Sequence, residues 1–152
     1  MKDVIERLLA RQAEGRDVGF AREVYSKQAD LRCVWTGVSL EKGFVVDHAI
    51  PFSVWRSNDL WNVFPAATKV NSSKSDKLVS KRALLLSRDR IIHYWETLKQ
   101  EAENRFVMEL GRSLVGFSGY DQGNWQGPAF AGLIRNVETL ALQRGLVRWE
   151  PS

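Results

Sequence analysis

The stretch FVVDHAIPFS, from Phe44 to Ser53, breaks an apolar run with Asp47 and His48 and then ends it at Pro51. Side by side at the end of a strand, a carboxylate and an imidazole cost stability unless each has a partner. Two interpretations follow. Asp47 caps a backbone amide in a turn, or the pair holds a metal ion and a water molecule. The residues around the stretch decide between them.

The composition of the 152-residue chain is that of one soluble domain, with 44% hydrophobic and 26% charged residues. No apolar run approaches the roughly 18 to 20 residues that a membrane span needs. The N-terminal segment carries acidic residues within its short apolar stretch, unlike a signal peptide. We therefore expect a cytoplasmic protein that has no membrane partner.

Basic residues gather between Ala66 and Arg90, although the net charge of the whole chain is only +4. Seven basic residues stand there against two acidic ones. They are Lys69, Lys74, Lys77, Lys81, Arg82, Arg88 and Arg90. A local cluster of this kind attracts a phosphate backbone, but on charge alone a solvated helix face explains it equally well.

The patterning along the chain indicates an α+β fold. Two β-favouring runs flank a turn-rich piece with Gly37 and Gly43, which is typical of a β-hairpin. Pro65 suits the first turn of a helix. The expected elements are helices over 2–13 and 20–28, hairpin strands over 32–35 and 44–46, and helices over 65–73, 87–115 and 128–144.

Asn62, Asn71 and Lys74 follow the Asp47–His48 pair along the chain. Hydrolysis of a phosphodiester needs an activated water, a divalent ion and stabilisation of the developing charge. A histidine suits the first task because its ordinary pKa lies near neutrality, and carboxylate and amide oxygens suit Mg²⁺. A helix that brings Asn71 beside Asp47 would complete a pair of metal ligands.

The string VVDHAIPFSVW…NDLWNVFPA…VNSSKSDKL resembles the HNH endonucleases. The resemblance covers residues 32 to about 78 and implies a ββα-metal core. That core would be embedded between N-terminal helices (about 2–28) and C-terminal helices (about 87–145). We expect a single nuclease domain over 1–152, which could also be a module of a longer protein.

Carried over residue by residue, the resemblance implies that His48 is the general base and that Asp47 and Asn71 are the metal ligands. Asn62 would complete the catalytic set by holding the loop and orienting His48. Lys74 would contact the phosphate. The neighbouring Arg56 and Asn58 lie in the same loop and could reach a phosphate, but we expect them to be simply solvated.

Mg²⁺ is the cofactor that the resemblance favours, with Mn²⁺ as a substitute, because Asn71 stands where many relatives have a histidine. Many HNH domains also bind a structural zinc through paired cysteines. Here Cys33 is the only cysteine, and Thr36 stands where its partner would be. No structural zinc is therefore expected, and Cys33 is interpreted as a buried strand residue.

The predicted function is a metal-dependent endonuclease that hydrolyses DNA. The candidate backbone contacts are Lys69, Lys77, Lys81, Arg82, Arg88 and Arg90. HNH domains occur as effector modules of restriction and phage-defence systems, so a targeting or regulatory partner is expected by analogy. A homodimer would allow both strands to be cut. Two alternatives stay open: an inactive nucleic-acid-binding module and an RNA-cleaving toxin.

Overall fold

The computed structural model describes residues 18–117 and 119–152, so the helix predicted over 2–13 lies outside the described residues. The chain combines helices with two small two-stranded sheets, and the α+β class is confirmed at that level. The elements are α2 (Gly19–Ser26), β1 (Val45–His48), α3 (Phe52–Trp55), η1 (Leu60–Asn62), β2 (Val63–Ala66), α4 (Thr68–Lys74), β3 (Leu78–Val79), α5 (Lys81–Leu86), α6 (Arg88–Glu101), α7 (Glu103–Leu110), η2 (Gly111–Val115), α8 (Gln126–Arg144) and β4 (Arg148–Trp149).

The first sheet differs from the predicted hairpin. Strand β1 pairs antiparallel with β2, with Val45 opposite Ala66 and His48 opposite Val63. The predicted partner, residues 32–35, instead belongs to a turn closed by one isolated bridge between Arg32 and Ser39. The predicted pairing was wrong because the long segment between β1 and β2 hides the second strand from local pattern reading.

Pro65 is the residue that misled the helix assignment. It lies inside β2, opposite Val46, and helix α4 begins only at Thr68. A proline has no amide hydrogen to donate, so it is tolerated only where a strand edge does not need one. Its carbonyl still accepts a hydrogen bond from the Val34 amide at 2.9 Å. Residue 34 thereby lies against the outer edge of β2.

The C-terminal half is helical, as predicted, but more divided. The helix expected over 87–115 consists of α6, α7 and the π-helical segment η2. The division between α6 and α7 falls at Ala102, whose φ of −149° and ψ of 64° are outside the helical region. The last helix, α8, begins at Gln126, two residues before the predicted start. The short pieces α3, α5, β3 and β4 had no clear signal in the sequence.

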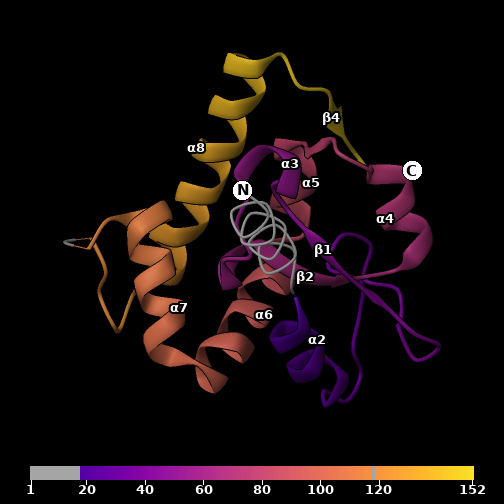
Figure 1. Ribbon diagram of the computed structural model, residues 1–152, viewed down its shortest axis with the longest axis horizontal. Helices are drawn as coiled ribbons and strands as arrows, with labels where there is room; N and C mark the ends of the chain where they lie inside the picture. The colour runs from indigo at the N-terminus through magenta and orange to yellow at the C-terminus, as the bar shows by residue number, and fades with distance from the viewer. Residues whose placement is uncertain (1–17, 118) are drawn as a thin grey trace, which may run out of the picture.

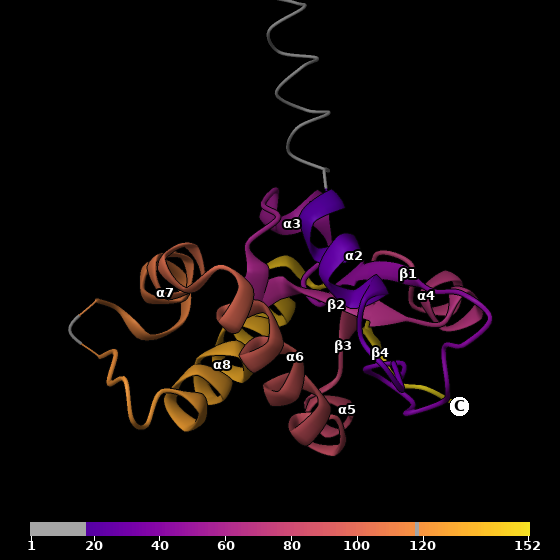
Figure 2. The ribbon, with the colours of Figure 1, turned by 90° about the horizontal axis from the view of Figure 1, so that it is seen from below.

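The strand pair lies between two groups of helices. Helix α4 packs against β1 on one side, and α6, α7 and α8 lie on the other (Figure 1). Seen from below, α2 and α3 lie on one side of the strands and α5 on the opposite side (Figure 2). Tyr25 of α2 donates to the Val63 carbonyl at 2.8 Å, and Trp95 of α6 donates to the Trp61 carbonyl at 2.7 Å. All four residues are buried, so α2 is tied to the first residue of β2 and α6 to η1 just before it.

The second sheet brings the end of the described chain back to α4. Strands β3 and β4 pair in parallel, with Leu78 opposite Arg148 and Val79 opposite Trp149. The Trp149 indole also donates to the Ser73 hydroxyl at 3.1 Å. Contacts between residues about 70 positions apart therefore fix the segment that follows α4.

Candidate active site

Four of the residues singled out by the sequence line one open cleft of about 460 Å³. Asp47 and His48 come from the end of β1, and Asn71 and Lys74 come from α4. Because β1 and β2 are antiparallel, α4 begins next to the start of β1, and its last residue, Lys74, lies beside the end of β1. The strand–strand–helix order thus brings together Asp47 and Lys74, which are 27 positions apart in the sequence.

The Asp47 carboxylate is almost fully buried, with 5% of the residue exposed. Its Oδ2 accepts a hydrogen bond of 2.7 Å from the Trp35 indole, and its Oδ1 lies 3.4 Å from the Lys74 ammonium. Each carboxylate oxygen has two lone pairs, so one contact leaves capacity for another ligand. The segment 32–35, predicted as a strand, therefore supplies a partner for the acid, through Trp35.

Lys74 does not lie at the surface, where a phosphate contact would need it. Its side chain is only 1% exposed, and its ammonium donates to the His48 carbonyl at 2.7 Å as well as to Asp47. Burial lowers the pKa of Lys74, while the charge of Asp47 opposes that shift. We therefore correct the expected role: the ammonium is an internal counter-charge that holds the end of β1.

Asn62 is fully buried and faces the loop backbone. Its Oδ1 accepts from the Ile50 amide at 2.8 Å, and its Nδ2 donates to the Ile50 carbonyl at 2.9 Å. The Asn62 carbonyl accepts from the Ala49 amide. Pairing a loop with a buried side-chain amide satisfies both groups. Asn62 thus ties together the residues directly after His48 and is absent from the lining of the cleft.

The His48 ring has a partner that the sequence did not indicate. Its Nε2 lies 2.8 Å from Oδ1 of Asn58, and the ring packs edge-to-face on Phe52 at 5.9 Å between centroids. Asn58 was expected to be solvated, yet it is part of the site. No role was predicted for Asp76 either, yet it lines the same cleft as Asn71.

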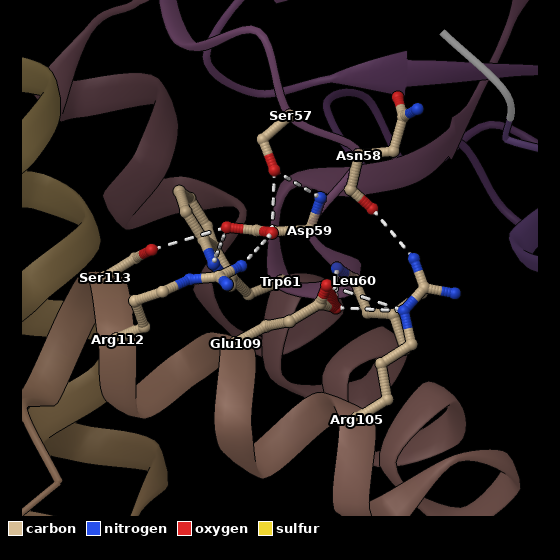
Figure 3. Close-up of polar contacts among 9 residues, drawn as sticks. All are labelled: Ser57, Asn58, Asp59, Leu60, Trp61, Arg105, Glu109, Arg112 and Ser113. Atoms are coloured by element: carbon tan, nitrogen blue, oxygen red, sulfur yellow. Dashed lines mark hydrogen bonds and ion pairs between the residues drawn. The ribbon is translucent and has the colours of Figure 1, made fainter. Parts of the chain in front are cut away.

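A polar cluster around the buried acids Asp59 and Glu109 holds the loop between β1 and β2 against the C-terminal helices (Figure 3). We call it the loop clamp; its members are Ser57, Asp59, Leu60, Trp61, Arg105, Glu109, Arg112 and Ser113. The Asp59 carboxylate accepts from the Ser57 hydroxyl at 2.7 Å, and from the Trp61 indole and Arg112 at 3.1 Å each. Because Asp59 is only 3% exposed, these partners replace its water shell.

Glu109 forms the other half of the clamp. Its Oε1 accepts from the Leu60 amide at 3.0 Å and from Arg105 at 3.2 Å. Burial raises the pKa of Glu109, against the opposing effects of the Leu60 amide and Arg105. The two acids of the clamp, Asp59 and Glu109, thus sit in one poorly solvated place. The charge of Asp59 also raises the pKa of Glu109.

This shift predicts a pH effect on stability. The folded chain binds the Glu109 proton more tightly than the unfolded chain does, so folding is favoured as pH falls from neutrality to the ordinary pKa of 4.5. The free energy of unfolding of the wild type minus that of Glu109→Gln should therefore rise over that range. Urea denaturation at each pH measures the difference. A difference that falls on acidification would contradict the assigned cause.

Five of the six residues predicted to contact a nucleic-acid backbone are exposed. Lys69 lies on α4, Lys77 follows it, Lys81 and Arg82 begin α5, and Arg88 begins α6. Arg82 pairs with Glu150 at 3.8 Å, but both side chains are about half exposed or more, so the pair holds it weakly. Arg90 differs, because its Nε donates to the Val34 carbonyl at 2.7 Å. Arg90 is therefore a structural residue.

The chain matches no protein-family model and no curated protein. Within residues 18–117 and 119–152, no helix is long and apolar enough to cross a membrane. Across the same described part of the chain, no three histidine, cysteine, aspartate or glutamate side chains gather in a metal-binding group.

Proposed function

We propose that the protein is a Mg²⁺-dependent endonuclease of the HNH type that hydrolyses DNA phosphodiester bonds. One observation carries the proposal. The strand–strand–helix unit β1–β2–α4 puts Asp47, His48 and Asn71 around a single open cleft. A ββα-metal core has this order of elements, and the three residues are those that the HNH resemblance names. If Asp47 only capped a turn, there would be no reason for His48 and Asn71 to line the same cleft.

The donor set fits a hard divalent cation. Asp47 offers a carboxylate oxygen and Asn71 an amide oxygen, and Mg²⁺ retains several waters when it binds to one or two protein oxygens. Asp76 adds a negative charge to the same cleft. When bound, the ion would polarise the scissile phosphate and stabilise charge on the leaving oxygen.

His48 supplies the base in this proposal. Its imidazole accepts a proton from a water molecule, whose oxygen attacks the phosphorus as the bond to the 3′ oxygen breaks. The 3′ oxygen takes a proton from solvent, which leaves a 5′ phosphate and a 3′ hydroxyl. Lys74 holds the backbone at the His48 carbonyl, and Asn62 holds it at the Ile50 amide two residues later. Their contribution is to fix the position of the base before substrate arrives.

The basic residues extend from the helix that lines the cleft. Lys69 and Lys77 lie on or just after α4, and Lys81 and Arg82 follow on α5. Exposed cations at such positions contact phosphates without reading sequence. Their exposure and their place beside the cleft support DNA as the partner. The affinity for DNA should therefore fall with added salt.

Metal dependence tests the proposal. Supercoiled plasmid is incubated with wild type in Mg²⁺, Mn²⁺ or EDTA; we expect nicked circles to appear first with either ion and no cleavage in EDTA. Asn71→Ala should need at least about tenfold more Mg²⁺ for half-maximal rate, because it removes a metal ligand. The matched control is Asn104→Ala, at an exposed helical asparagine of α7, which should behave like wild type.

Other outcomes separate the alternatives. Cleavage that persists in EDTA would contradict metal dependence. Cutting of RNA but not of plasmid would favour the RNA-cleaving alternative. Tight DNA binding without cleavage in any ion would favour the inactive binding module.

A further inference from the structure

The ring of the proposed base makes a short polar contact with Asn58. Asn58 lies in the β1–β2 loop, ten positions after His48, and its side-chain Oδ1 is 2.8 Å from Nε2 of the ring. Both residues are half-buried. An amide oxygen has lone pairs but no hydrogen, so it can only accept. In the neutral ring the hydrogen must then reside on Nε2, and the basic lone pair is on Nδ1.

We propose that Asn58 is a positioning residue that fixes the tautomer of His48. It holds the neutral imidazole in the Nε2–H form and thereby directs the proton-accepting Nδ1. The tautomer itself is a property of the folded chain, whereas its use in catalysis rests on the proposed endonuclease function. A neutral ring without such an acceptor would exchange between both tautomers, and only one of them presents its lone pair in the required direction.

Asn58 is itself held by the loop clamp. Arg105 of α7 donates to the Asn58 backbone carbonyl at 3.3 Å (Figure 3). The next two residues are fixed as well, because Asp59 pairs with Arg112 and the Leu60 amide donates to Glu109. The helices beyond the β1–β2–α4 unit thus determine where the Asn58 amide lies, and through it the orientation of the ring.

The tautomer can be measured without any assay of cleavage. The chain has 2 histidines, so ¹⁵N-labelled histidine gives two imidazole patterns in a long-range ¹H–¹⁵N spectrum, and His93→Gln assigns them. The spectrum is recorded at pH about 8.5, where an ordinary histidine is neutral. For wild type we expect the His48 pattern of a protonated Nε2 and an unprotonated Nδ1.

Two variants of similar size separate the acceptor from the shape of the side chain. Asn58→Asp keeps an acceptor oxygen and should keep the Nε2–H pattern. Asn58→Leu removes the acceptor and should shift His48 to an averaged pattern of both tautomers. A wild-type His48 that is averaged or protonated on Nδ1 would overturn the inference. So would an unchanged Nε2–H pattern in Asn58→Leu.

The rate of plasmid cleavage supplies the functional arm at the same pH. Asn58→Leu should lower kcat by about 10- to 100-fold, a range typical of losing a group that orients an active-site histidine. Asn58→Asp should retain most of the rate. Equal rates for Asn58→Leu and wild type would contradict the positioning role. If wild type shows no cleavage at all, the endonuclease proposal fails, and the tautomer measurement still decides the inference.

Discussion

Replacing His48 with alanine is expected to lower the rate of plasmid cleavage by about 10²- to 10⁴-fold, the range for loss of a general base. The reason is chemical. The alanine side chain cannot accept the proton of the attacking water, while the partners of Asp47 stay in place. Single-turnover cleavage with excess enzyme measures the effect on the chemical step. The Mg²⁺ concentration for half-maximal rate should change little, because the proposed ligands Asp47 and Asn71 are retained.

His93 provides the matched control. It is the other histidine of the chain, lies exposed on α6, and packs its ring on Tyr94 at 5.2 Å between centroids. His93→Ala should therefore cleave at the wild-type rate. Thermal unfolding of both variants is needed as well, since His48 packs on Phe52. Equal rates for wild type and folded His48→Ala would identify a contaminating nuclease and remove His48 from the mechanism.

The sequence predicted the composition of the cleft better than it predicted the fold around it. Asp47, His48 and Asn71 were predicted to lie together because their order and spacing resemble the HNH motif. The strand partner was missed, since Pro65 looks like a helix start and the pairing of β1 with β2 bridges a loop that contains α3 and η1. Non-local strand pairing leaves little trace in a local pattern.

The polar contacts that complete the site were also beyond local reasoning. Asn58 is indistinguishable from a solvated loop residue until Arg105, 47 positions later, meets its carbonyl. The same holds for Asp59 and Arg112, which are 53 positions apart. Lys74 ends a helix beside exposed serines, and only the antiparallel return of β2 buries its ammonium against Asp47. Side-chain burial of this kind depends on tertiary packing.

That burial leads to the largest expected effect on stability. Lys74→Met should lower the free energy of unfolding by about 3 to 5 kcal/mol, as is typical when one partner of a buried ion pair is removed. Methionine fills much of the space of the lysine stem. Among the described residues, it leaves the Asp47 carboxylate, 6% exposed, with the Trp35 indole as its donor. It also removes the donor to the His48 carbonyl. Urea denaturation at neutral pH measures the change.

Lys69→Met is the control for this substitution, because Lys69 is an exposed lysine of the same helix. It should change the stability by no more than about 0.5 kcal/mol. A loss below about 1 kcal/mol for Lys74→Met would contradict the buried-pair assignment. Such a small effect would mean that the ammonium and the carboxylate are better solvated than their burial indicates.

A double-mutant cycle separates the charge pair from the packing of the lysine stem. Asp47→Asn keeps the shape of the acid but leaves the Lys74 ammonium buried beside a neutral group, so it should also be strongly destabilising. Combining it with Lys74→Met removes both charges. The double variant should therefore lose less free energy of unfolding than the two single variants lose together. Strict additivity would assign the loss to packing alone. Coupling would mean that Lys74 balances the charge of the proposed metal ligand in the metal-free protein, which makes Asp47 tolerable in the cleft before an ion binds.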